Sequence, residues 1–492
     1  MSLSSPVMSL DDDVVLKIFS FLHIPEITSL RQTCRRFYLA SRLRIVWTDF
    51  CASEILGAGY PFPDVPLESL PVDDLERMVR HAHGLATRWR NDALDPQTIG
   101  TVQMGTGTAA SVVRFLPGRG GRWLLTISKG IWSIVTLWRI DAPGGLRKAC
   151  EWSPRRALID GFALNKDTTS DVAVALSLRF QQDDQQVVQL LALREEGKDV
   201  HLEEVLNTPL ETTFKPTLLD GNILALSDDL ASTIILDWKQ GLYATLEQPN
   251  EENGLLTHDS GVLVELARQS VLVVRARSVH LFPYPVLRPR DKDPLTYRPH
   301  ASHSFGWVDG VGVQILRRLG HPWLSILVRP ECDDPWTVDA RGLDLYTLTP
   351  NPAADDDDGA KAPSYLFPPV LVERFHSSRG PLRCTDLVMG RCATAVWVQP
   401  PDYSSAGLLF GNDDGRSLQN NVPSLNSHET MMAGAFTGPL GLGPGGGQVP
   451  ATRLGRMLFQ NPLNDWTSLD YDEELGRIAF GSSGGSVKVV QL

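Results

Sequence analysis

The 492-residue sequence predicts a mainly β protein with a small N-terminal α-helical region. Apolar residues recur with helical spacing only before about residue 95. From about residue 100 to the end, β-rich segments follow one another in pairs around polar turns. The second strands of the early pairs end about 43–53 residues apart, which is close to the length of one four-stranded propeller blade. Seven such pairs therefore predict a seven-bladed β-propeller.

The first helical region covers residues 9–50 and has one apolar stripe. Val15, Phe19 and Leu22 continue a helical spacing that begins at Val14, and Asp11–Asp13 precede it, where carboxylates favour a helix N-terminus. Pro25 suits the first turn of a second helix. We expect three helices here, which are too short to bury a core without a partner or the rest of the chain.

Residues 51–95 form a connector. Its first part, up to residue 71, contains four prolines, and its second part is predicted to be a helix. Apolar residues recur from Leu75 to Trp89 with a period of 3.6, and Asp73 and Asp74 lie in the expected first turn. This pattern predicts a linker helix with one buried face.

The β-rich part spans residues 96–492. Its paired segments begin at WLLTIS with SIVTLWRI and end at GRIAFGS with SVKVVQL. Two stretches interrupt the spacing, near 351–363 and near 411–450, and their Asp-, Gly- and Pro-rich compositions predict flexible insertions. The tryptophans include no Trp-Asp dipeptide, so two β-sandwiches or a β-helix stay open as alternatives to the propeller.

Composition limits the function classes. The formal net charge is −12, which argues against nonspecific nucleic-acid binding. No run of 18 apolar residues occurs, so we expect no membrane span. The six cysteines are scattered and the N-terminus has no secretory pattern, which together predict a reduced protein of the cytoplasm, the nucleus or both.

Sequence motifs for catalysis or metal binding are incomplete in this chain. Gly481–Gly485 matches G-x-S-x-G, but no acid or histidine follows, so a turn between two strands fits better. His81 and His83 are two positions apart on a predicted helix and point to different faces. His300 and His303 have only Cys332 as a third possible ligand, and the run Asp355–Asp358 lacks calcium-loop spacing. We therefore expect no catalytic residue, no metal site and no cofactor.

Residues 9–47 resemble an F-box. That motif runs Leu-Pro, then Ile-Phe-Ser-x-Leu, a Leu, Cys-x-x-Phe and a final Trp, and the matching residues are Leu10, Ile18, Phe19, Ser20, Leu22, Leu30, Cys34, Phe37 and Trp47. Asp11 stands where the family usually has Pro. The linker helix resembles that of fungal-type F-box proteins with β-rich C-terminal halves. The alternative is a generic three-helix cap on the propeller.

The resemblance implies a substrate-recognition subunit of an SCF-type ubiquitin ligase, which is not itself an enzyme. Its partners would be a Skp-type adaptor, a cullin reached through that adaptor, and an unknown target protein on the β-rich domain. The residues implied for adaptor binding are Leu10, Ile18, Phe19, Leu22, Leu30, Cys34 and Phe37. A scaffold acting outside a ligase and a propeller enzyme with a docking segment stay open.

Five arginines lie between residues 31 and 44 without an acidic residue among them. Two interpretations follow. The arginines could steer an acidic adaptor toward the F-box, or they could form an ordinary exposed helix face.

Overall fold

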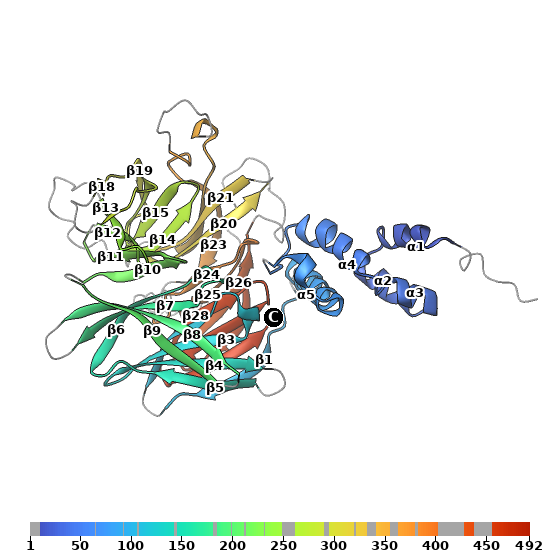
Figure 1. Cartoon of the computed structure of the whole chain (residues 1–492), viewed down its shortest axis with the longest axis horizontal. Helices are drawn as coiled ribbons and strands as arrows, with labels where there is room; N and C mark the ends of the chain where they lie inside the picture. The colour runs from blue at the N-terminus through green and yellow to red at the C-terminus, as the bar shows by residue number, and fades with distance from the viewer. Residues whose placement is uncertain are drawn as a thin grey trace, which may run out of the picture.

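The computed structural model describes all residues of the chain except 1–9, 64, 92, 106–107, 142–144, 181–184, 198, 211–212, 231, 248–260, 290–294, 319–320, 332–340, 355–362, 379–381, 402–427 and 437–454. It has two parts (Figure 1): a helical arm and a β-propeller from which that arm projects. No helix among the described residues is long and apolar enough to cross a membrane.

The arm contains four short α-helices before the linker, where the sequence predicts three. They are α1 (Asp12–Phe19), α2 (Ile24–Arg31), α3 (Arg35–Ala40) and α4 (Arg44–Phe50), followed by a π-helical segment (Cys51–Leu56), a 3₁₀ turn (Leu67–Ser69) and α5 (Val72–Arg90). The predicted second stripe breaks after Arg31, because the Thr33 hydroxyl donates to the Leu30 carbonyl at 2.7 Å and competes with continued helix.

Seven antiparallel sheets make up the propeller, and each has at least four strands. The first three contain β2 (Ala109–Phe115), β3 (Trp123–Lys129), β4 (Ser133–Asp141) and β5 (Gly145–Trp152); β6 (Ala157–Leu164), β7 (Val172–Phe180), β8 (Gln186–Glu196) and β9 (Asp199–Leu210); and β10 (Lys215–Asp220), β11 (Ile223–Ser227), β12 (Ser232–Asp237) and β13 (Leu242–Glu247), with short β17 (Arg288–Pro289) and β18 (Thr296–Tyr297) beside β13.

The other four sheets complete the ring. They contain β14 (Gly261–Ala267), β15 (Ser270–Arg275), β16 (Ser278–Pro283) and β19 (Ala301–Ser304); β20 (Val308–Arg318), β21 (His321–Pro330), β22 (Arg341–Leu348) and β23 (Val370–Ser377); β24 (Leu387–Met389), β25 (Thr394–Gln399), β26 (Glu429–Ala435) and β27 (Arg456–Asn461); and β28 (Trp466–Asp472), β29 (Arg477–Ser482), β30 (Ser486–Gln491) and β1 (Gln97–Gln103). A seven-bladed propeller is confirmed.

The seventh blade closes the ring with strands from both ends of the propeller sequence. β1 pairs antiparallel with β30, with Val102 opposite Val487 and Thr98 opposite Val490. Val487 and Val489 are fully buried. Closure in this way pairs both edges of β30, because β29 lies on its other side, and places β1 at the outer edge of the blade.

The strand order gives the propeller two different rims. Because each blade is an antiparallel meander, the turns joining its first to second and third to fourth strands lie on one rim. The second-to-third turns and the crossings between blades lie on the other. Leu475 and Gly476, in a first-to-second turn, contact α5. We call the rim with the first-to-second and third-to-fourth turns the α5 rim. The rim with the second-to-third turns and the crossings between blades is the distal rim.

Part of the predicted insertion at 411–450 is sheet rather than loop. β26 supplies the third strand of the sixth blade and pairs with β25, with Val396 opposite Ala433. The described residues leave out 411–427 and 437–450 of this stretch and 355–362 of the other predicted insertion. Composition was misleading here because Gly434 of β26 lies against the rings of Phe375 and Trp397, which leave no room for a side chain at that position.

Candidate protein-docking site

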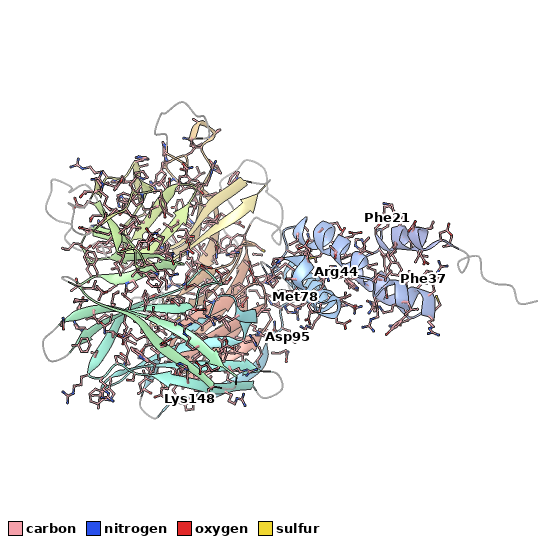
Figure 2. The ribbon with its side chains drawn as sticks, in the orientation of Figure 1. Phe21, Phe37, Arg44, Met78, Asp95 and Lys148 are labelled. Atoms are coloured by element: carbon pink, nitrogen blue, oxygen red, sulfur yellow. The ribbon has the colours of Figure 1, made fainter. Side chains whose placement is uncertain are left out.

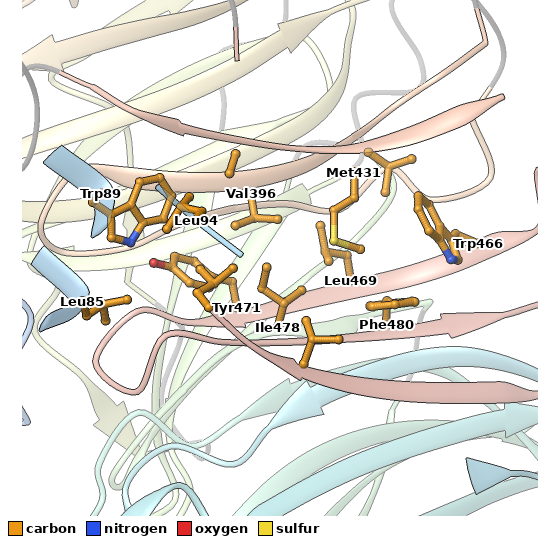
Figure 3. Packing of buried hydrophobic residues seen from close by; sticks show 14 of the residues in the cluster. Leu85, Trp89, Leu94, Val396, Met431, Trp466, Leu469, Tyr471, Ile478 and Phe480 are labelled. Atoms are coloured by element: carbon orange, nitrogen blue, oxygen red, sulfur yellow. The ribbon is translucent and has the colours of Figure 1, made fainter. Parts of the chain in front are cut away.

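The linker helix α5 belongs to two hydrophobic cores at once. Its first half places Leu75, Val79 and Ala82 in the core of the arm. Its second half places Leu85 and Trp89 in a core made with blades six and seven (Figure 3), where Trp89 lies 6.4 Å from the Tyr471 ring. The His81 ring nitrogen Nε2 also lies 3.0 Å from the Leu475 carbonyl. One continuous helix therefore fixes the arm on the propeller.

The arm has a small aromatic core. Phe19 of α1 and Phe37 of α3 meet edge to face at 6.3 Å, with their rings 72° apart. Trp47 of α4 is fully buried, and its indole N–H donates to the Ser41 carbonyl at 2.9 Å. These contacts position α1 and α3 side by side at the end of the arm farthest from the propeller (Figure 2).

Arginines tie the helices of the arm together. Arg31 of α2 makes a bidentate ion pair with Glu76 of α5, at 2.7 and 3.1 Å, and also donates to Ser41. Arg42 pairs with Asp73 at 2.7 Å, and Arg44 donates to the Leu70 carbonyl at 2.7 Å. The helices are thus joined by charge-assisted bonds that compensate for a small apolar core.

The contacts of the five arginines between residues 31 and 44 test whether they form a steering surface or an ordinary exposed helix face. Arg36 pairs with Asp12 at 2.8 Å and also donates to the Leu10 carbonyl. Four of the five arginines therefore hold the arm together, and carboxylates of the same chain neutralise three of them. Arg35 is exposed. Neither a steering surface nor an ordinary exposed face describes the stretch as a whole.

The seven residues that sequence reasoning proposed for adaptor binding fall into three groups. Phe19 and Phe37 are buried in the core of the arm. Ile18 is exposed, with 36% of its surface accessible. The four others are half-buried around that core: Leu10, Leu22, Leu30 and Cys34.

Sequence reasoning missed the most exposed apolar side chains of the arm. Phe21, just after α1, is 72% exposed, and Leu39 of α3 is 56% exposed. The full set of exposed apolar residues between α1 and α4 is Val14, Ile18, Phe21, Tyr38, Leu39, Leu43 and Ile45. The sequence did contain a signal for this surface, because these residues are apolar but lie beside the helical stripe whose side chains form the core of the arm. So many large apolar side chains on so small a unit indicate a protein-docking surface.

The candidate motifs for chemistry lie in separate places within the described residues. His81 and His83 pack within the arm and its junction, and burial lowers the pKa of both. Gly481 and Ser482 end β29, and residues 483–485 form the expected turn to β30. No group of three or more metal-ligating side chains gathers within the described part of the chain, and Cys332 lies outside that part. Each of the five described cysteines is a free thiol.

One half-buried ion network lies in the propeller and links β2, β28 and Asp386, the residue before β24. Arg114 of β2 pairs with Asp386 at 2.6 Å and donates to the Ser468 hydroxyl at 2.9 Å. Asp470 accepts the Phe115 N–H at 2.6 Å. Burial raises the pKa of Asp470 to about 6, whereas Arg114 outweighs burial at Asp386 and lowers its pKa. Because every polar group here has a partner from the propeller, the network is structural.

Residues 10–53 match the protein-family model described as F-box-like. No curated protein matches the chain. Among solved structures, a humanized mutant of the Chaetomium thermophilum Polycomb Repressive Complex 2 bound to the inhibitor GSK126 is similar at 12% identity, with a TM-score of 0.48 and coverage of 81% of this chain and 97% of that chain. The Myceliophteria thermophila Cps50 (Swd1) β-propeller domain is similar at 11% identity, with a TM-score of 0.46 and coverage of 80% and 99%.

The family match covers the arm up to the π-helical segment, and the sheets that follow form a complete ring. The chain therefore combines an F-box-like segment at residues 10–53 with a seven-bladed β-propeller domain.

Proposed function

We propose that this protein is the substrate-recognition subunit of an SCF-type ubiquitin ligase. In this proposal the F-box docks on a Skp-type adaptor, which links to a cullin, and the propeller binds a target protein. The chain itself makes and breaks no bonds. The proposal also implies a cytoplasmic or nuclear location, where the other subunits of such a ligase work.

The observation that carries the proposal is the set of exposed apolar side chains on an F-box-like arm. Val14 and Ile18 of α1 and Phe21, just after that helix, recur at helical spacing, and all three are exposed. They lie beside Phe19, whose ring is already used in the core of the arm. The arm thus folds with one apolar face satisfied and another left for a partner, which is how an amphipathic helix enters a groove.

The shared helix α5 supports the second half of the proposal. A receptor has to hold adaptor and target at a fixed separation, and α5 is continuous between the two cores. The bidentate Arg31–Glu76 pair further fixes α2 to this helix. The arm and the propeller are therefore joined through a helix that packs in both.

The test is the double variant Ile18→Ala with Phe21→Ala, measured by titration calorimetry against a purified Skp-type adaptor. Interface anchors typically cost about 2 kcal/mol each, so two should weaken binding by about a hundredfold or more. Both side chains are exposed, so we expect the thermal melt to stay unchanged. The matched control is Leu366→Ala with Val370→Ala, two exposed apolar residues on the propeller.

Unchanged adaptor affinity in the Ile18/Phe21 variant would exclude this surface as the docking site. A pull-down with the wild-type protein and adaptor then tests for cullin, which distinguishes a ligase subunit from a scaffold outside a ligase. If adaptor binds and cullin does not, the protein acts as a scaffold outside a ligase.

A further inference from the structure

The distal rim carries large apolar side chains that the propeller leaves uncovered. Leu463, between blades six and seven, is 78% exposed. Ile131 and Trp132, in the turn between β3 and β4, are 75% and 48% exposed. Soluble proteins rarely display such side chains together unless they bind a partner.

Hydrogen bonds show that these turns are neighbours around the rim. The Ser483 N–H donates to the Asp465 carbonyl at 2.8 Å, which places the β29–β30 turn beside the loop of Leu463. The Met104 N–H donates to the Gly485 carbonyl at 2.8 Å and brings in the loop before β2. The side chain of Thr108, in that loop, adjoins Gly130. The rim is thus continuous from blade six through blade seven to blade one.

Basic side chains surround these apolar ones. Lys129 precedes Ile131, and Arg155 and Arg156 lie in the crossing to blade two, next to the Ser153 hydroxyl that donates to Ser133 at 2.9 Å. Arg383 lies beside Ser483, with 3.4 Å between the guanidinium and the hydroxyl. All four are exposed, whereas Asp465 is half-buried and accepts a hydrogen bond from Asn461 at 2.9 Å. A local basic surface therefore stands on a chain whose formal net charge is −12.

We propose that this surface, defined by Lys129, Ile131, Trp132, Arg155, Arg156, Arg383 and Leu463, binds a target segment in which acidic side chains flank an apolar one. The proposal rests on the proposed function and names the face and the chemistry of its target. The exposed Trp132 and Leu463 would receive the apolar side chain, and the basic side chains would receive the carboxylates. A segment with the reversed charge pattern would be repelled by Lys129, Arg155, Arg156 and Arg383.

The location of the surface agrees with a two-partner molecule. α5 and the arm occupy the opposite rim, where Leu475 and Gly476 contact the helix. A target on the distal rim would not compete with an adaptor on the arm. Both partners could be held at the same time.

The experiment is display selection of random unphosphorylated peptides against the full-length protein in the absence of adaptor. We expect enriched peptides to share Asp or Glu on either side of a large apolar residue, and their affinity to fall as ionic strength rises. Two variants divide the surface into its parts: Trp132→Ala removes an apolar anchor, and Arg155→Glu with Arg383→Glu reverses two charges. Each should weaken the enriched peptides by at least about tenfold.

The matched control is Leu366→Ala with Arg122→Glu, an exposed apolar and an exposed basic residue on the α5 rim. We expect it to bind the peptides like the wild type. Selection that enriches no shared pattern, or peptides that bind the surface variants and the wild type equally, would overturn the proposal. Since adaptor takes no part in the selection, this result is independent of whether the F-box docks on an adaptor. Loss of adaptor binding alone would count against the ligase function and leave the target surface standing.

Discussion

The helical arm and the propeller use their apolar residues in opposite ways. In the arm, α1 buries only Val15 and Phe19 of its eight residues. In the propeller, β15 and β25 each bury all six. Sheets stacked around a ring cover both of their faces, whereas short helices lying side by side leave one face in solvent. A substitution in the propeller core should therefore act on stability, and a substitution on the exposed face of the arm should act on binding.

Ring closure should have the largest effect on stability. Deleting residues 486–492 removes β30, which lies between β29 and β1, and uncovers the edges of both. We expect loss of the cooperative melt and aggregation, because unpaired edges pair with other chains. Size-exclusion chromatography and a thermal melt measure this. A truncated protein that stays monomeric with an unchanged melting temperature would contradict closure by this strand.

The boundary between the two regions can be sharpened with two fragments. A fragment of residues 96–492 lacks Leu85, Trp89 and Leu94, which are buried against Tyr471 and Ile478. A fragment of residues 71–492 retains them. Because each buried large side chain contributes about 2–5 kcal/mol, we expect the shorter fragment to be less stable by about 5 kcal/mol or more in chemical denaturation. Equal stability would mean that α5 is only attached to the propeller and takes no part in its core.

Within the arm, Phe19 and Phe21 form a matched pair of residues for the comparison. Phe19→Ala leaves a cavity beside Phe37 and should cost about 3–5 kcal/mol. Phe21→Ala removes an exposed ring and should change stability by no more than about 0.5 kcal/mol. Hydrogen exchange of the α1–α3 amides reports the stability of the arm apart from that of the propeller. Equal loss of protection in both variants would show that Phe21 belongs to the core.

The smallest predicted effect is a difference in pH dependence between two half-buried aspartates, Asp386 and Asp470. The pKa of Asp386 is lowered from 3.8, so its contribution to stability is present above pH 3.8 and is lost as the pH falls below that value. The pKa of Asp470 is raised from 3.8 to about 6, so its contribution is full below pH 3.8 and is lost as the pH rises to about 6.

Two asparagine substitutions test these signs by thermal melts across the pH range. Relative to the wild type, Asp470→Asn should become more stable as the pH rises from about 4 to 6. Asp386→Asn should become less stable as the pH rises through the acidic range up to about 4, because Arg114 loses its charged partner. If the two variants shift in the same direction, Arg114 does not distinguish the two carboxylates.

Much of the architecture follows from local pattern alone. The strand pair predicted at residues 123–140 forms the second and third strands of its blade, where apolar runs are dense because both faces are covered. The outer strands carried a weaker signal, and β9 alternates between exposed and half-buried positions. The stripe from Leu75 to Trp89 was also sufficient to predict α5, because a helix buries one face whatever lies against it.

Other features depend on contacts between residues distant in the sequence. Nothing near Trp89 reveals that it packs on Tyr471, or that the second half of α5 leaves the core of the arm for that of the propeller. Likewise, Ile18 and Phe19 are adjacent apolar residues, and only the packing of α1 on α3 decides that Phe19 is buried while Ile18 is exposed. Sequence by itself determined which segments are helix or strand, since that depends on the spacing of apolar residues along the chain. Tertiary structure decided which apolar residues serve stability and which are left for a partner, since that depends on which faces the other elements cover.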